Sequence, residues 1–143
     1  MMNTINIYLS GGMGGLSFEE QVGWRNQIVS NIMNDDSLTF KPIFFNPPYF
    51  YTPAHNYHKN EKEVMEFDLY KLRKSDIVIV NFNVPNSIGT AMELMLAKEY
   101  NIPIIGININ NKELHPWLSE CCGRMCDSIE ETIEYVKKYY LTN

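Results

Sequence analysis

The sequence of 143 residues contains no run of 18 apolar residues and no block of like charges. Without a long apolar run no membrane-spanning helix is predicted. With a net charge of −5, the chain has no basic surface for duplex nucleic acid or an acidic membrane. The segment Met1–Ile5 has no basic stretch leading into a long apolar one, so a cytoplasmic protein is expected. A small nucleotide would be the expected link to nucleic acid.

Cysteine is scarce. The three cysteines, Cys121, Cys122 and Cys126, are clustered and lack the paired C-x-x-C spacing typical of zinc sites. His115 lies nearby, so a metal site is the alternative interpretation, but reduced and partly packed thiols are favoured. We therefore expect no metal and no cofactor.

The remaining composition is that of a globular chain, with 45% hydrophobic and 20% charged residues. Its length allows one domain, residues 1–143, to bury a core without disulfides. No internal repeat, linker or low-complexity tract divides it.

Apolar runs alternate with helical patterns along the chain. Strands are expected over residues 4–9, 39–45, 76–82 and 103–109. Helices are expected over 18–33, 61–75 and 128–140, and a further helix contains Glu93 and ends near Tyr100. The connector 110–123 contains a short helical turn around Trp117. This order predicts an α/β fold: a doubly wound, Rossmann- or flavodoxin-like parallel sheet of four to five strands with helices on both faces.

The most informative segment is Asn86–Glu93. It follows the β-branched run at 76–82, which is typical of a strand buried on both faces of a parallel sheet. Ligands collect where such strands end and helices begin. We expect Glu93 in the first turn of the next helix, ionised and facing a ligand. The alternative is that Glu93 only complements the helix dipole.

A second carboxylate lies on an apolar helix stripe. Asp68 falls three residues after Met65 and four before Leu72, on the side expected to face the sheet. Burying a carboxylate costs several kcal/mol unless it is paired or protonated. Asp68 and Glu93 are therefore expected to converge on one pocket, unless Asp68 has a purely structural partner.

The glycine-rich loop Gly11–Gly15 lets backbone approach a phosphate or sugar closely. It matches neither the P-loop nor the dinucleotide fingerprint, and a plain tight turn is the alternative.

The long segment 46–60 contains Tyr49, Phe50, Tyr51 and Tyr57, which could stack on a planar base. Packing of these rings against the sheet edge is favoured for most of them, with one or two touching a ligand.

Three segments together resemble the nucleoside 2-deoxyribosyltransferase family. They are Tyr8-Leu9-Ser10-Gly11-Gly12-Met13, then Asp68 ahead of the run Asp76–Val80, then Ser87-Ile88-Gly89-Thr90-Ala91-Met92-Glu93-Leu94. The resemblance spans nearly the whole chain. Its most specific part is the strand followed by the serine, glycine and glutamate of the last segment.

The resemblance implies N-glycosidase or deoxyribosyltransferase chemistry. Glu93 would be the nucleophile that attacks C1′ of the sugar, Asp68 would assist at the base or sugar, and Tyr8 would orient Glu93. This fits the oxocarbenium-like transition state of glycosidic cleavage, which a carboxylate can stabilise and then trap covalently.

Ser87 bears on the substrate. Transferases of free nucleosides commonly carry an acidic residue there, whereas the related 2′-deoxynucleoside 5′-phosphate N-hydrolases carry serine, which can donate to a phosphate. The resemblance therefore favours a monophosphate substrate and water as acceptor. It implies substrate contacts from Ser10, Gly11, Gly12, Met13, Ser87 and Gly89, and from Ser119 of a neighbouring subunit, hence a homodimer or higher homo-oligomer.

Three alternatives stay open. Met13 and Gly14 occupy the loop region where phosphate-specific relatives carry an arginine, so phosphate binding would depend on amides, hydroxyls and Arg124 of a partner. Base exchange on free nucleosides is therefore the closest alternative. A catalytically inactive nucleotide-binding sensor and cleavage of a nicotinamide dinucleotide are the others.

Overall fold

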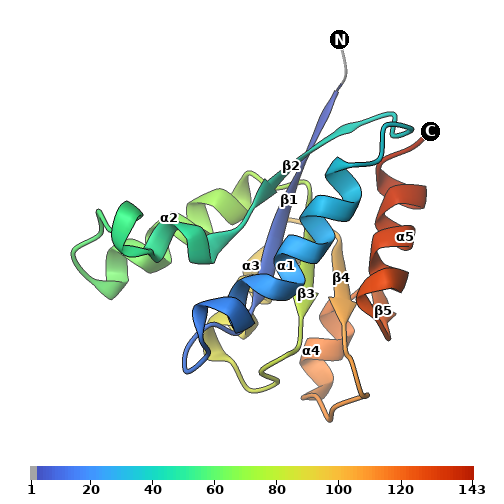
Figure 1. Ribbon diagram of the computed structural model, residues 1–143. Helices are drawn as coiled ribbons and strands as arrows, with labels where there is room; N and C mark the ends of the chain where they lie inside the picture. The colour runs from blue at the N-terminus through green and yellow to red at the C-terminus, as the bar shows by residue number, and fades with distance from the viewer. Residues whose placement is uncertain (1–2) are drawn as a thin grey trace.

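The computed structural model describes residues 3–143 (Figure 1). Met1 and Met2, part of the N-terminal segment considered above, lie outside the described residues. The sheet consists of β1 (Thr4–Gly11), β2 (Lys41–Phe45), β3 (Ile77–Asn81), β4 (Ile104–Ile107) and β5 (Arg124–Cys126). All five strands are parallel, in the order β2-β1-β3-β4-β5. The predicted parallel sheet is confirmed, and its fifth strand, β5, had not been assigned from the sequence.

Helices cover both faces of this sheet, as predicted. They are α1 (Phe18–Met33), α2 (Glu61–Arg73), α3 (Ile88–Glu99), α4 (Pro116–Cys121) and α5 (Ile129–Tyr140). One core cluster joins α1 and α5 to the sheet through Ile28, Ile32 and Ile133. The other contains Leu72 of α2 and Leu94 of α3. Figure 1 shows α1 and α5 side by side in front of the strands, with α3 behind them.

Local signals fix where two helices begin. Ser17 caps α1 by accepting from the Glu20 amide, while the Glu20 side chain accepts from the Ser17 amide, which is the expected capping box. Ser128 caps α5 in the same position by accepting from the Glu131 amide at 3.1 Å. The segment 46–60 is not irregular throughout, because it forms two 3₁₀ turns, η1 (Pro47–Tyr51) and η2 (Pro53–His55).

The strand order places a crevice between β1 and β3. The chain moves from β1 to β2 in one direction, then crosses β1 to reach β3 and continues the other way to β5. In open parallel sheets, ligands bind at the carboxyl ends of the strands where the order reverses. The carboxyl ends of β1 and β3 carry Gly11 and Asn81, which pair in register.

The sequence predicted neither a membrane-spanning helix nor a metal site. Along residues 3–143, no helix has both the length and the apolar character needed to cross a bilayer. Cys126 is buried and Cys121 and Cys122 are half-buried, all as free thiols. In this part of the chain no three His, Cys, Asp or Glu side chains are grouped so that they could hold a metal ion.

Candidate active site

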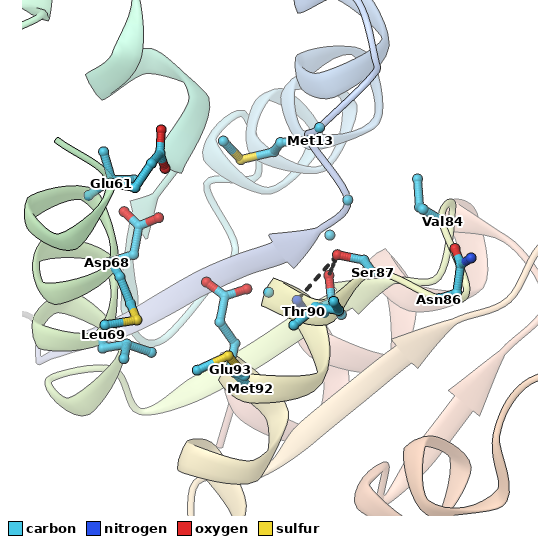
Figure 2. Close-up of a pocket in the computed structure, with 17 residues that line it drawn as sticks. Met13, Glu61, Asp68, Leu69, Val84, Asn86, Ser87, Thr90, Met92 and Glu93 are labelled. Carbon is cyan, nitrogen blue, oxygen red and sulfur yellow. Dashed lines mark hydrogen bonds between the residues drawn. The ribbon is translucent and has the colours of Figure 1, made fainter.

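A cavity of about 480 Å³ opens at the carboxyl ends of β1 and β3, between α2 and the beginning of α3. Figure 2 shows Asp68 and Glu61 on the α2 side, Glu93 at the centre and Ser87 on the opposite side. The expected residues that line the cavity are Gly11, Gly12, Met13, Asp68, Ser87, Gly89 and Glu93. Tyr8 and Ser10 lie beneath it, where they contact Glu93.

Glu93 lies one turn further along α3 than expected. The helix begins at Ile88 after the N-cap Ser87, which makes Glu93 its sixth residue and leaves the first turn without an acidic side chain. The prediction of a first-turn Glu93 is therefore wrong. Its carboxylate is oriented instead by side chains of β1. The Tyr8 hydroxyl donates to Oε2 and the Ser10 hydroxyl donates to Oε1 at 2.8 Å.

The pKa of Glu93 is determined mainly by burial and not by the helix dipole. Loss of solvent raises the pKa of Glu93 to about 7, and nearby Asp68 adds to the rise. The hydrogen bonds from Tyr8 and Ser10 and the charge of Arg25 oppose it. The expectation that Glu93 is held ionised is corrected, because a pKa of about 7 leaves both the protonated and the ionised form populated at neutral pH.

Asp68 faces the same cavity from the middle of α2. Its partner is the Tyr51 hydroxyl, which donates to Oδ1 from the end of η1. Burial raises the pKa of Asp68 to about 6, against the opposing effects of the Tyr51 hydrogen bond and the Arg25 charge. The structure thus brings together the two carboxyls that the sequence pattern had singled out, each bonded to a tyrosine.

Tyr8 is fully buried on β1, and its ring stacks on Phe45 with centroids 5.2 Å apart. Burial, reinforced by the charge of Glu93, raises the pKa of Tyr8 well above its usual value. The phenol therefore keeps its proton and remains a hydrogen-bond donor to Glu93 across the pH range in which Glu93 titrates.

The glycine loop forms the upper rim of the cavity. The Gly12 amide donates to Asn83 Oδ1 at 3.0 Å, and a Cβ atom at Gly12 would lie 2.5 Å from Val84 Cγ2. Glycine at position 12 therefore lets the end of β1 pack directly on the loop that follows β3. By contrast, a Cβ at Gly14 would meet nothing within 4 Å, so that glycine is not required by packing.

Ser87 stands at the other end of the cavity. Its Oγ accepts from the Thr90 amide at 3.3 Å and from the Thr90 hydroxyl at 3.0 Å, so its own proton remains available for donation. The first-turn amides of Ile88 and Gly89 have no acceptor within the helix. This end of the cavity offers hydrogen-bond donors, whereas the α2 end offers carboxylates.

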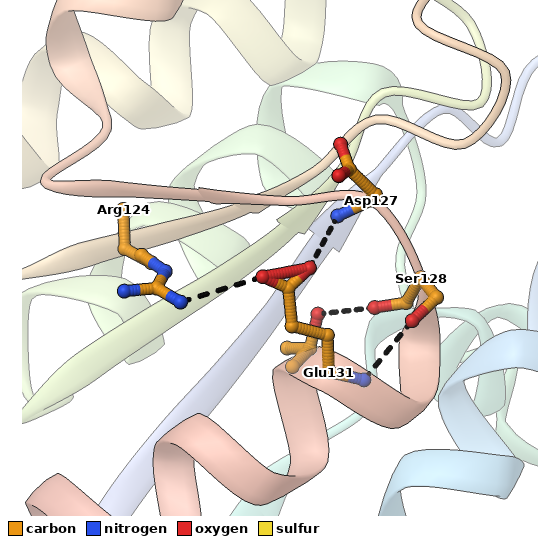
Figure 3. A network of polar contacts seen from close by, with 5 residues as sticks. Arg124, Asp127, Ser128 and Glu131 are labelled. Carbon is orange, nitrogen blue, oxygen red and sulfur yellow. Dashed lines mark hydrogen bonds and ion pairs between the residues drawn. The ribbon is translucent and has the colours of Figure 1, made fainter.

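Two residues expected to assist the substrate lie elsewhere in the chain. Ser119 is exposed on α4 and does not line the cavity. Arg124, on β5, is bonded to Glu131 at 3.4 Å, within the network that begins α5 (Figure 3). In that network the Asp127 amide also donates to Glu131, at 2.8 Å. Within one subunit neither Ser119 nor Arg124 belongs to the site.

Two neighbours of the carboxyls were not predicted. Tyr51 was one of several loop aromatics, and only its bond to Asp68 distinguishes it. Arg25 was passed over, although it lies on the buried stripe of α1 with Val22 and Ile28. A charged residue on an apolar stripe is the signal that identified Asp68, and it would have identified Arg25 as well.

Two of the other loop aromatics pack against the protein, as favoured for most of them, whereas Tyr57 is 86% exposed. Phe50 stacks on Phe45 at 5.0 Å and meets Phe67 edge-on at 5.2 Å. Tyr49 packs edge-on against Phe18 at 5.3 Å. Phe18, Phe45 and Phe67 therefore support η1, the turn that carries Tyr51.

No protein-family model and no curated protein matches this chain. Solved structures do match. A conserved protein from Enterococcus faecalis V583 superposes with a TM-score of 0.75 and 16% identity, over 94% of this chain and 98% of that one. The 2-deoxyribosyltransferase of Bacillus psychrosaccharolyticus superposes with a TM-score of 0.72 and 16% identity, over 91% of each chain. The CMP N-glycosidase of Clostridium botulinum superposes with a TM-score of 0.57 and 14% identity, over 94% of this chain and 99% of that one. The chain therefore has the fold of these proteins, as the motif resemblance implied.

Proposed function

We propose that the protein is a cytoplasmic N-glycosidase that hydrolyses 2′-deoxynucleoside 5′-monophosphates through a covalent glycosyl-Glu93 intermediate. The observation that carries the proposal is the pair of half-buried carboxyls in one cavity, Glu93 held by Tyr8 and Ser10, and Asp68 held by Tyr51. Two solved structures of the same fold bear the names of a 2-deoxyribosyltransferase and a CMP N-glycosidase.

The two carboxyls divide the chemistry. An oxygen of ionised Glu93 bonds to C1′ while the bond from C1′ to the base nitrogen breaks, and the electron pair of that bond leaves with the base. Protonated Asp68 gives its proton to the departing base. Water then bonds to C1′ and releases Glu93, while the surplus proton of that water returns to Asp68. The cycle balances as a hydrolysis and needs no cofactor.

Hydroxyl and amide donors support a phosphate at the Ser87 end. The free proton of Ser87 and the first-turn amides of α3 point to an anion, and the positive end of the helix dipole favours one. Ser10 does not contribute there, because its hydroxyl donates to Glu93.

Base exchange on free deoxynucleosides is the second candidate, and one observation favours it. The charged side chains that line the cavity in the described chain are Glu61, Asp68 and Glu93, all acidic. A cavity with three carboxyls and no lining cation disfavours a phosphate dianion relative to a neutral 5′-hydroxyl.

Chromatographic detection of free base separates the candidates. The panel contains deoxynucleoside 5′-monophosphates and the matching nucleosides, each with and without a second base as acceptor. Base release from monophosphates without an acceptor supports the hydrolase. Exchange confined to free nucleosides supports the transferase. If neither reaction occurs, tight nucleotide binding indicates the inactive sensor, and release of nicotinamide from a dinucleotide indicates the remaining alternative.

Substitution Ser87→Asp tests the phosphate contact. Aspartate caps a helix as well as serine does, but it places a negative charge beside the phosphate. We expect kcat/KM for monophosphates to fall by about 10-fold or more, with little change for the matching nucleosides. Ser128→Asp, the same change at the N-cap of α5, is the matched control. Equal losses for both kinds of substrate would show that Ser87 does not contact the phosphate.

We further propose that the chain works as a homo-oligomer, with Ser119 completing a neighbour's cavity. The surface between α3 and α4 carries Ile88 and Trp117, each 77% exposed, and shares Ser87 with the catalytic cavity. A second copy seated there would cover this apolar surface beside the substrate. Sedimentation velocity of the full chain is expected to give a dimer or larger species at micromolar concentration, and a monomer would contradict the proposal.

A further inference from the structure

Arg25 is a fully buried cation behind the candidate site. It extends from α1 to the carboxyl end of β1, where its Nε donates to the Leu9 carbonyl at 3.3 Å and its Nη2 donates to the Gly11 carbonyl at 3.3 Å. Its Nη1 donates to the Gln21 carbonyl, and its guanidinium carbon lies 4.6 Å from the centre of the Trp24 ring. Every hydrogen bond of Arg25 in the described structure thus goes to backbone.

A buried charge without an ionic partner needs a reason. Among residues 3–143, the ion pairs within 4.0 Å involve other side chains, so no carboxylate contacts Arg25 directly. Burial lowers the pKa of Arg25 to about 10, which still leaves it charged at neutral pH. Removing such a cation from water is costly, and backbone carbonyls compensate only in part. The carboxyls whose charges act on Arg25 are Glu93 and Asp68, the two acids of the candidate site.

The position of Arg25 links it to Glu93 in two ways. The carbonyls of Leu9 and Gly11 flank Ser10, so Arg25 fixes the backbone from which the Ser10 hydroxyl donates to Glu93 at 2.8 Å. Its charge also acts through the low-polarity interior, where an unscreened cation favours the ionised form of a carboxyl.

We infer that Arg25 is a positioning residue that holds the end of β1 against Glu93 and favours the ionised, nucleophilic form of that glutamate. This inference rests on the proposed function only in calling Glu93 the nucleophile. No motif of the sequence resemblance includes Arg25.

The surroundings of Glu93 make Arg25 its cationic counterpart. Tyr8 faces Glu93 from β1, Asp68 and Glu61 from α2, and Tyr51 from η1. These groups are neutral donors or acids. In the described chain, Arg25 is the cation whose charge lowers the pKa of both Glu93 and Asp68. Without it, only the hydroxyls of Tyr8 and Ser10 would favour ionised Glu93.

The test compares Arg25→Met and Arg25→Gln, which remove the charge, with Arg25→Lys, which keeps it. Carbon NMR of labelled glutamate gives the titration midpoint of Glu93, assigned by its loss in Glu93→Gln, and needs no turnover. The pH dependence of kcat/KM for base release gives the acid limb. We expect both neutral variants to move the midpoint and the limb upward by about half a pH unit or more. Arg25→Lys should stay nearer to wild type.

Arg73→Met, at the exposed end of α2, is the matched control and should move neither midpoint. An unchanged midpoint with a uniformly lower rate would overturn the inference, because it would make Arg25 a purely structural residue. Unfolding of both neutral variants would overturn it for the same reason. Absence of base release from every wild-type substrate would instead overturn the proposed function, while the NMR titration would still decide the role of Arg25.

Discussion

Glu93→Gln is expected to abolish base release, with kcat lower by about 10⁴-fold or more. The amide has nearly the shape of the carboxylate, but it can neither bond to C1′ nor offset the positive charge that develops on the sugar. Chromatography of released base, in single-turnover and steady-state experiments, measures the loss. Both candidate reactions need this carboxylate, so retained turnover would contradict both.

The stability of the same variant provides its internal control. Burial raises the pKa of Glu93 from its ordinary value near 4.5 to about 7. A group whose pKa is higher in the folded state contributes stability that is complete below its unfolded pKa and is lost as the pH rises through the folded one. Glutamine has no charge to bury, so at pH 8 the thermal midpoint of Glu93→Gln should not be lower than that of wild type. A collapse of the fold would show that the lost activity has another origin.

A matched substitution distinguishes the role of Glu93 as nucleophile from a general effect of negative charge in the cavity. Glu61 lines the same cavity from the exposed start of α2. Glu61→Gln removes the same charge from the cavity but leaves Glu93, Tyr8 and Ser10 in contact. Turnover of Glu61→Gln should therefore stay within about a few-fold of wild type, since a solvent-exposed carboxyl acts weakly at a distance.

The sheet could be predicted because its strands carry strong apolar runs. Ile77–Asn81 is buried along its whole length, and such a run has one structural use in a chain of alternating strands and helices. The strand β5 was not predicted because it is short. Its three residues, Arg124–Cys126, include one buried side chain, and no period can be read from so few positions.

The site was located from sequence more accurately than its electrostatics. Local patterns predict where β3 ends and α3 begins. Because Ser87 is the N-cap of α3, however, Glu93 lies in the second turn of the helix and not in the first. The charge state of Glu93 depends on burial by groups from β1 and α2, which no local pattern reports. The helix dipole alone predicted an ionised Glu93, but desolvation raises the pKa of this carboxyl.

The two groups that lower the pKa of Asp68, Arg25 by its charge and Tyr51 by its hydrogen bond, also differ in how well the sequence predicts them. Arg25 could have been found, since it breaks the apolar stripe of α1 as Asp68 breaks that of α2. Tyr51 could not be chosen among its aromatic neighbours before the 3₁₀ turn η1 was known, because that turn alone directs its hydroxyl toward Asp68.

Asp68→Asn has the second largest expected effect, and that effect should depend on the leaving base. Proton donation by a positioned acid contributes about 10² to 10⁴-fold. We expect a loss in this range for ordinary purine and pyrimidine substrates. A nucleotide whose base is methylated on a ring nitrogen already carries a positive charge, so its base departs without a proton. For that substrate Asp68→Asn should retain most of the wild-type rate.

The pH profile gives an independent measure of the same role. Glu93 must be ionised and Asp68 protonated, with pKa values of about 7 and about 6, so wild-type kcat/KM should peak between these values. The rate should fall above this range as Asp68 loses its proton, and Asp68→Asn should lack that alkaline limb. Asp76→Asn, at a carboxyl that accepts from the Asn6 amide far from the cavity, is the control.

Comparing the two substrates decides what Asp68 does. A loss confined to ordinary bases identifies it as the proton donor, because only those bases need the proton. Equal losses for ordinary and methylated bases would mean that Asp68 acts on the sugar or on Glu93 instead. In that case its charge, which raises the pKa of Glu93, would be its main effect on the reaction. The alkaline limb would then persist in Asp68→Asn, because another group would be responsible for it.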